Sequence, residues 1–346
     1  MMQISPETQL FIREHSSDDV RVLALQAKKY PDIDMPTAIT QIAGRKVAAE
    51  KIPSWWEIEK IWYPKHLSLE QCSSEITARY KARLLQGDSL TDLTGGFGID
   101  CSFLATGFKS ATYVERQEEL CEIAAHNFPV LNLNHINIKN EDGVTYLQAM
   151  SPVDCLFLDP ARRNEHGGKT VAISDCEPNV AELEELLLQK ANRVMIKLSP
   201  MLDLSLALKE LKQTQEVHIL SVNNECKELL ILLGQTSPTE ISIHCVNLST
   251  KGTQEEQHFV FTREQEQCSE CTYTDSLETY LYEPNASLLK AGAFRSIAAA
   301  YPVRKLHPNS HLYTSDTFIE NFPGRIFRIV NQCSFNKKEV KENLAD

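Results

Sequence analysis

The sequence predicts an α/β protein: a largely parallel, doubly wound sheet of seven strands, preceded by a helical segment and followed by a small α+β module. Three observations predict this fold. Short apolar runs alternate with amphipathic stretches from about residue 88 to residue 233, as in a chain of βα repeats. Only residues 223–227 separate the last two runs, so those strands must pair as a hairpin. Prolines divide residues 1–85 into short helices, and the composition changes after Thr239.

The expected elements follow the chain in order. The strands are the apolar runs, namely Leu90–Leu93, Ala111–Val114, Ile136–Ile138, Cys155–Leu158, Val194–Leu198, Val217–Val222 and Leu229–Leu233. Helices are expected between most of them, at Ile99–Thr106, Gln117–Leu131, Gly143–Met150, Val180–Ala191 and Leu204–Leu211. The C-terminal module should contain strands near residues 241–246, 258–262, 311–313 and 324–330 and a helix over residues 285–300.

Composition limits the class of protein. The 346 residues are 42% hydrophobic and 24% charged, which is typical of a soluble globular chain. No apolar run approaches the ~20 residues that a membrane span needs, and the first ten residues do not resemble a signal peptide. Ten scattered cysteines then favour reduced thiols and a cytoplasmic location. The net charge of −12 argues against broad, non-specific coating of DNA.

The most informative motif is Asp-Leu-Thr-Gly-Gly-Phe-Gly-Ile-Asp at residues 92–100. It follows an expected strand and begins an expected helix, so its glycines can pass close under a ligand that faces the helix N-terminus. It is not a P-loop, and Cys101 stands where the dinucleotide motif has a third Gly or Ala. A tight turn without a ligand is the alternative. Asp92 and Thr94 lie where the charged amino-acid end of a ligand could be held.

Other polar residues end neighbouring strands, where open α/β sheets place their active sites. Glu115 stands 19 residues after Gly96, near the offset at which a carboxylate accepts ribose hydroxyls. Asp142 precedes Gly143 at a helix start, where it either caps the helix or accepts from an adenine amino group.

The fourth expected strand ends in Asp159-Pro160. Proline biases Asp159 toward an extended backbone, so its carbonyl and carboxylate can both face a ligand. Arg162 and Arg163 follow as candidate substrate-binding residues, although the segment could be a simple turn with solvated arginines. Lys197 and Ser199 end the fifth strand, for substrate binding or ordinary strand-end capping.

Together these residues resemble the class I S-adenosylmethionine-dependent methyltransferases, over about residues 70–235. The resemblance implies a Rossmann-like, seven-stranded methyltransferase sheet with S-adenosylmethionine as cofactor. The implied cofactor-binding residues are Asp92, Thr94, Gly95, Gly96, Gly98, Glu115, Asp142 and Gly143. Asp159 and Pro160 would be the catalytic pair facing the methyl group.

The whole chain is similar to one bacterial subgroup, which has a ferredoxin-like piece before a THUMP-like C-terminal domain. Three stretches carry this similarity: residues 67–82, 281–294 and 306–325. The implied division is a helical segment at 1–85, a methyltransferase core at 86–236, the ferredoxin-like piece at 237–280 and the THUMP-like domain at 281–346. THUMP domains are associated with structured RNA, so the resemblance implies a base of tRNA or rRNA as methyl acceptor.

One departure concerns the acceptor. Enzymes that methylate amino groups of bases commonly follow the acidic residue with Pro-Pro-aromatic, whose ring stacks on the base. Here Asp159 is followed by Pro-Ala-Arg. An arginine plane, Phe97 or an aromatic of the N-terminal segment could stack instead, and an exocyclic amine stays one option.

Three weaker features complete the sequence analysis. Cys268-Ser-Glu-Cys271 is a single CxxC motif, and although His244, Cys245 and His258 are near in sequence, we expect no metal. Trp55, Trp56 and Trp62 are interpreted as packing residues. From residue 285 onward nine Lys/Arg and five Asp/Glu give a balance of 9 − 5 = +4, so Arg304 and Lys305 are candidate RNA contacts.

These observations favour a methyltransferase of structured RNA. A methyltransferase for a small molecule or a protein would need the same cofactor site. A non-catalytic RNA-binding protein, with a purely structural site, is the hypothesis from another class. Neither a membrane nor a metal is expected as a partner.

Overall fold

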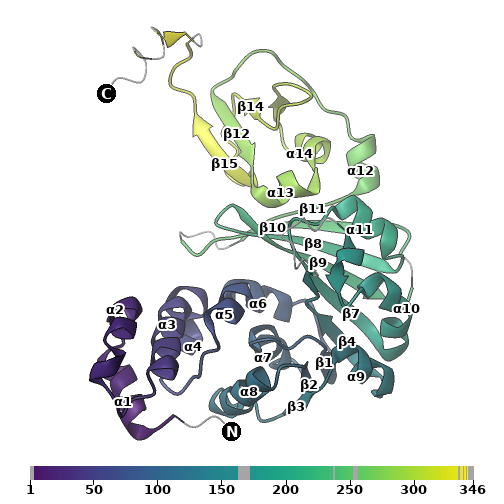
Figure 1. Cartoon of the computed structure of the whole chain (residues 1–346). Helices are drawn as coiled ribbons and strands as arrows, with labels where there is room; N and C mark the ends of the chain where they lie inside the picture. The colour runs from purple at the N-terminus through teal and green to yellow at the C-terminus, as the bar shows by residue number, and fades with distance from the viewer. Residues whose placement is uncertain are drawn as a thin grey trace. The chain divides into compact units, whose positions relative to one another are not determined.

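A computed structural model describes residues 4–162, 172–236, 238–251, 256–333, 336, 337, 339 and 341 (Figure 1). The chain divides into two compact units, Met1–Thr214 with Ile231–Ser237 and Gln215–Leu230 with Pro238–Asp346. No helix among the described residues is long and apolar enough to cross a membrane.

The first unit begins with short helices, as the prolines indicate. They are α1 (Pro6–Glu14), α2 (Val20–Leu25), the 3₁₀ turn η1 (Ala27–Lys29), α3 (Met35–Lys51), α4 (Pro53–Trp56), α5 (His66–Gln71) and α6 (Glu75–Ala82). Three of them have a proline at the first or second position, where a proline loses no helical hydrogen bond. Phe11, Leu23 and Ile42 form a small core between α1, α2 and α3.

The main sheet contains all seven expected strands. They are β1 (Ser89–Asp92), β2 (Ser110–Glu115), β3 (Ile136–Asn140), β4 (Val153–Leu158), β7 (Ala191–Leu198), β8 (Thr214–Val222) and β9 (Glu225–Gly234). Their order is β8-β9-β7-β4-β1-β2-β3, and β3, β2, β1, β4 and β7 pair in parallel. The expected hairpin turns at Asn223 and Asn224, which both have positive φ.

Two further strands extend this sheet to nine. They are β10 (Ser242–Leu248), parallel to β8, and β11 (Glu256–Thr262), antiparallel to β10. We expected these residues in a separate piece at 237–280. They pair with the main sheet instead, because β8 is almost wholly buried and would expose an unpaired edge without β10. β10 covers that edge with alternate buried residues such as Ile243 and Cys245.

Helices follow the strands as expected. They are α7 (Ile99–Ala105), α8 (Glu118–Val130), α9 (Gly143–Ala149), α10 (Val180–Lys190) and α11 (Leu204–Glu210). The short strands β5 (Ala161–Arg162) and β6 (Cys176–Glu177) pair with each other, with the 3₁₀ turn η2 (Ile173–Asp175) just before β6. Because β1, β2, β4 and β7 are parallel, their carboxyl ends meet at one edge of the sheet.

The C-terminal module has a second, antiparallel sheet of four strands. Its elements are α12 (Arg263–Cys268), β12 (Tyr280–Pro284), α13 (Ala286–Ala291), α14 (Phe294–Ala300), β13 (Arg304–Lys305), β14 (Tyr313–Ser315) and β15 (Gly324–Arg328). The order is β13-β14-β12-β15. The helix expected over 285–300 is two helices, because Gly292 takes a φ of +76° and ends α13. Tyr282, Tyr313 and Phe322 are buried at the centre of the module.

Candidate functional site

The glycine loop has the geometry of a cradle. A Cβ on Gly95 would lie 2.2 Å from the Tyr113 ring, so only glycine fits there. Gly96 and Gly98 have φ values of +54° and +87°, which favour glycine. A Cβ on Gly96 would have only the Thr94 carbonyl within 4 Å, at 3.7 Å. The loop is therefore tightly packed on its inner side at Gly95 and open at Gly96.

Glu115 lies beside this loop. One carboxylate oxygen accepts the Gly96 N–H at 2.8 Å, and the other accepts the Gln117 N–H at 2.8 Å. The Tyr113 hydroxyl donates to the Gly96 carbonyl at 2.5 Å. The end of β2 thus fixes the loop, and each carboxylate oxygen keeps a lone pair for a further donor.

Asp92 ends β1 and is only 1% exposed. It accepts the Thr94 N–H at 3.0 Å, and the Thr94 hydroxyl accepts the Asp159 N–H at 2.6 Å. Burial raises the pKa of the Asp92 carboxyl well above its usual range, and the neighbouring carboxylates add to the rise. Thr94 therefore joins the ends of β1 and β4, and the buried Asp92 carboxyl group is next to this link.

Asp142 caps α9, as one of its two expected roles requires. Its Oδ1 accepts the N–H groups of Val144 and Thr145, both at 3.0 Å. A Cβ on the next residue, Gly143, would lie 2.2 Å from the Leu93 carbonyl oxygen. Glycine therefore lets the start of α9 approach the residue that follows β1. A contact between Asp142 and adenine stays a prediction.

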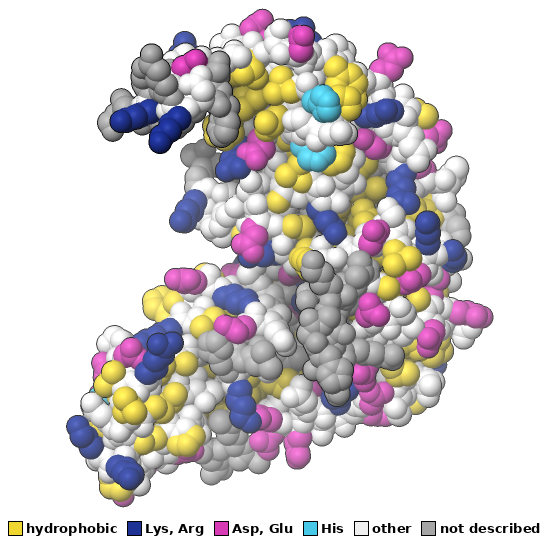
Figure 2. Space-filling view, turned by 45° about the horizontal axis from the view of Figure 1, so that its top comes forward, with side chains coloured by type: hydrophobic (Ala, Val, Ile, Leu, Met, Phe, Trp, Pro, Cys, Tyr) yellow, Lys and Arg dark blue, Asp and Glu magenta, His cyan; other side chains and the backbone are white. Residues whose placement is uncertain are grey.

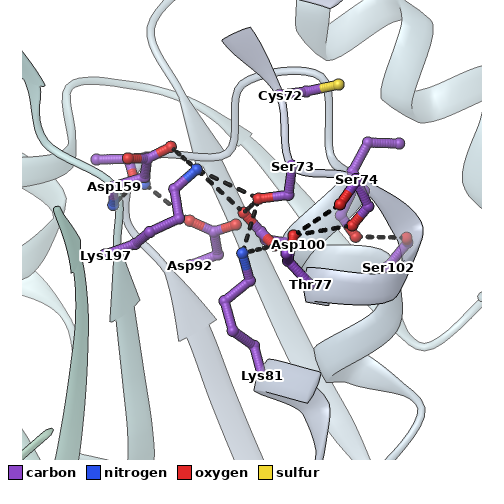
Figure 3. Close-up of polar contacts among 12 residues, drawn as sticks. Cys72, Ser73, Ser74, Thr77, Lys81, Asp92, Asp100, Ser102, Asp159 and Lys197 are labelled. Carbon is purple, nitrogen blue, oxygen red and sulfur yellow. Dashed lines mark hydrogen bonds and ion pairs between the residues drawn. The ribbon is translucent and has the colours of Figure 1, made fainter. Parts of the chain in front are cut away.

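A cluster of charged side chains lies next to Asp92 (Figure 3). The Lys197 ammonium is 2.5 Å from Asp159 Oδ2 and 3.6 Å from Asp100 Oδ2, and it donates to the Ser73 hydroxyl at 3.3 Å. Desolvation raises the pKa of the Asp159 carboxyl, and the Lys197 charge opposes that rise. Lys197 thus binds the predicted catalytic carboxylate.

Lys81 completes this cluster from α6. Its side chain is fully buried, 2.9 Å from Asp100 Oδ1 and 2.7 Å from the Ser73 hydroxyl. Ser73 in turn donates to Asp100 Oδ2 at 2.7 Å. Burial by itself would raise the pKa of Asp100, but the two ammonium groups outweigh it and lower the pKa. Two lysines and two aspartates therefore neutralise one another.

The sequence alone indicates no role for Ser73, Lys81 or Asp100. Lys81 on the buried side of a short helix could have indicated such a cluster, because a fully buried ammonium needs a carboxylate partner. Asp100 lies within the glycine motif, but its partner Lys81 comes from another helix. Only the folded chain brings the two together.

Two aromatic residues considered for base stacking, Phe97 and Trp55, pack inside the protein. Phe97 is 4% exposed and packs edge-on against Trp55 at 5.2 Å, so the Phe97 ring has no free face for a base. Trp55 is buried, and Trp62 stacks on His126 at 3.7 Å, which confirms packing for both rings. Pro160 is buried. Arg163 and the side chain of Arg162 lie outside the described residues.

The prediction for Lys305 needs a correction, whereas Arg304 is exposed and stays a candidate RNA contact. Lys305 is 2% exposed and donates to the carbonyls of His307 and Pro308 at 3.2 and 2.6 Å. Arg304 forms an ion pair with Glu278. Acidic residues just before position 285 therefore offset part of the local positive balance. On the face drawn in Figure 2, Lys and Arg are interspersed with Asp and Glu.

Comparisons with known proteins agree with this architecture. A crystal structure described as a candidate methyltransferase from Porphyromonas gingivalis W83 matches with a TM-score of 0.86 and 34% identity, over 99% of this chain and 86% of that chain. A family model described as a ferredoxin-like domain matches residues 280–323, whereas we expected the ferredoxin-like piece at 237–280. A search of curated proteins finds no match.

Two other solved structures resemble part of the chain. A candidate methyltransferase from Streptococcus mutans in complex with S-adenosylhomocysteine has a TM-score of 0.34 and 13% identity, over 46% of this chain and 96% of that chain. An rRNA methylase from Streptococcus thermophilus has a TM-score of 0.33 and 14% identity, over 46% and 93%. The similarity to the Porphyromonas protein covers nearly the whole chain, and the chain therefore belongs to the class I methyltransferase family, in the bacterial group with a ferredoxin-like domain near the C-terminus.

Proposed function

We propose that this protein transfers a methyl group from S-adenosylmethionine to a base of structured RNA, tRNA or rRNA. The observation that carries the proposal is the link between the glycine loop and Asp159 through Thr94. Through this link the Asp159 carboxylate, which would orient the acceptor, lies beside the loop that would hold the cofactor.

The residues at the loop fit the proposed cofactor. Gly96 is open on its outer side, and the two Glu115 oxygens can each accept a ribose hydroxyl. The buried Asp92 suits a ligand with a positive charge, because a cation would stabilise its ionised form. Bound there, S-adenosylmethionine would supply an electrophilic methyl group.

Asp159 is the residue that would orient the acceptor. Lys197 occupies its Oδ2, so Oδ1 can accept a hydrogen bond from a nucleobase N–H. Lys197 would keep the carboxylate ionised as it loses contact with water, since the opposite charge favours the ionised form. Pro160 has no backbone N–H, so it cannot donate to Asp159 Oδ1 in place of the nucleobase.

RNA is the proposed acceptor because of the similarity to proteins with a THUMP-like domain in three stretches of the chain. Because Lys305 is buried, contacts to RNA would come from the exposed Arg304 and from residues other than Lys305. An RNA acceptor would be met in the cytoplasm. The boundaries of the core at 86–236 and of the C-terminal domain at 281–346 stay part of this proposal.

The test uses RNA from a strain that lacks the gene. Purified protein and isotopically labelled S-adenosylmethionine should label that RNA, and mass spectrometry of its nucleosides should identify the modified base. Asp159→Ala should lower turnover by about 100-fold or more while cofactor affinity stays within a few-fold. Asp32→Ala removes an exposed carboxylate from the turn between η1 and α3 and is the matched control.

Three outcomes would change the proposal. Labelling of proteins or small molecules in place of RNA would favour the alternative substrates. RNA binding without any turnover would favour a non-catalytic RNA-binding protein. Full activity of Asp159→Ala would remove this carboxylate from the active site.

A further inference from the structure

Histidines gather on three adjacent strands of the second unit. Glu216 and His218 lie two residues apart on β8, so they point to the same face of the sheet. His244 on β10 is the register partner of His218. His258 on β11 is diagonal to His244, because its own partner is Val246. Four potential metal ligands therefore share one face, although 42 residues separate the first from the last (258 − 216).

Their ligand atoms lie close together. Glu216 Oε2 is 3.2 Å from His218 Nε2, and His244 Nδ1 is 3.1 Å from His258 Nε2. Ligand atoms of Glu216, His218 and His244 all lie within 4.8 Å of one another. The rings of His218 and His244 are stacked 4.3 Å apart. Modest rotations of these side chains would direct the three ligand atoms to a common point.

We infer that Glu216, His218 and His244 form a binding site for a divalent transition-metal ion of the zinc type, with His258 as a fourth ligand. Two imidazoles and a carboxylate are a donor set that such ions prefer. Bonds of ~2.0–2.1 Å in a tetrahedral site put neighbouring ligand atoms about 3.3 Å apart, close to the two shortest separations in the cluster. The ion would join β10 and β11 to β8.

Protonation does not oppose this inference. Burial lowers the pKa of His244 to about 4, and the imidazoles of His218 and His258 add to the effect, while Glu216 acts in the opposite direction. His244 is therefore neutral at pH 7, which is the form of imidazole that binds metals.

This site differs from the one considered in the sequence analysis. Cys245 follows His244 directly, so it points to the opposite face of β10, where it is fully buried. Cys268 is exposed and Cys271 partly exposed, beyond the end of β11. The partner that matters, His218, is remote in sequence and becomes a neighbour only through the parallel pairing of β8 and β10.

Cobalt(II) is the probe, because its visible absorption reports both binding and the type of ligand. We expect the metal-free full-length chain to bind one Co²⁺ with tetrahedral bands, to lack sulfur-to-cobalt charge transfer, and to release Co²⁺ to Zn²⁺. His244→Ala should weaken binding by about 100-fold or more, since losing even an outer partner of a metal ligand costs about 10–100-fold. Glu216→Gln, at a partly exposed position, is the second variant if His244→Ala fails to fold.

Matched controls separate the alternatives. His126→Ala removes a histidine that contacts Trp62 and the Lys60 carbonyl, and it should leave Co²⁺ binding unchanged. The double variant Cys268→Ser/Cys271→Ser should also bind normally. Absence of binding by the wild-type chain would overturn the inference. Loss of binding in the cysteine variant, with sulfur charge transfer in the wild type, would overturn it in favour of the CxxC motif.

Discussion

Lys197 and Lys305 are both buried lysines, and the sequence suggested substrate binding for both. Their surroundings differ. Lys197 contacts the carboxylates of Asp159 and Asp100. Lys305 donates to two backbone carbonyls and lies 5.6 Å from the centre of the Phe294 ring, and desolvation lowers its pKa. The charge of Lys197 favours the ionised form of a carboxylate at the candidate site, whereas Lys305 holds a loop of the C-terminal module together. The partner, more than the residue type, decides the role.

The largest expected effect concerns the folding of the two units. Lys81→Met leaves Asp100 without its closest counter-ion and should lower the free energy of unfolding by about 3–5 kcal/mol. Lys305→Met removes hydrogen bonds to two carbonyls and should cost about 1–3 kcal/mol. Urea unfolding measures both. Lys65→Met, at an exposed pair with Glu119, should change stability by at most about 1 kcal/mol. Equal losses for Lys81→Met and Lys65→Met would mean that the cluster contributes little.

Turnover should separate Lys197 from Lys305. Lys197→Met should lower the rate of methyl transfer by about 100-fold or more, because Asp159 loses the charge that orients it. Without that charge the pKa of Asp159 rises further. Activity needs the ionised carboxylate and disappears as pH falls through this pKa, so the acidic limb of the pH–rate profile should move to higher pH. Lys305→Met should leave the limb in place. An unshifted limb in Lys197→Met would show that Lys197 does not act through Asp159.

The two lysines also show which contacts can be predicted from the sequence. The βα alternation, the glycine motif and the strand ends placed Asp92, Glu115 and Asp159 at one edge of the sheet, because parallel strands bring their ends together. Contacts between remote elements were not predictable in this way. Lys81 reaches Asp100 from a helix outside the repeat, and β10 extends the sheet because β8 needs a partner on its outer edge. The positive balance counted from residue 285 overstated the local positive charge. Two of its arginines pair with Glu278 and Glu283, which lie just before that residue.

Cofactor affinity tests the role of Glu115 at the glycine loop, with an exposed glutamate as the control. Glu115→Ala removes the two oxygens proposed to accept the ribose hydroxyls and also frees the Gly96 N–H. A charge-assisted hydrogen bond contributes about 1.5–3 kcal/mol, so affinity for S-adenosylhomocysteine should fall at least about tenfold by calorimetry. Glu118→Ala removes an exposed carboxylate from the first turn of α8 and should have little effect. Equal affinities for Glu115→Ala and the wild type would disprove the ribose assignment.

The smallest effect compares two buried carboxylates: Asp100, which has two lysine counter-ions, and Asp92, which has none among the residues that the structure describes. Lysines lower the pKa of Asp100, whereas burial raises that of Asp92 well above its usual range. If Asp92 faces the cationic end of the cofactor, binding selects its ionised form, so affinity is highest above the raised pKa and falls as pH drops through it. The slope is at most about tenfold per pH unit, the value for one linked proton. Calorimetric titrations with S-adenosylhomocysteine across pH measure it. Asp92→Asn should bind more weakly and flatten the slope, whereas an Asn variant that keeps the wild-type slope would assign the proton to another group.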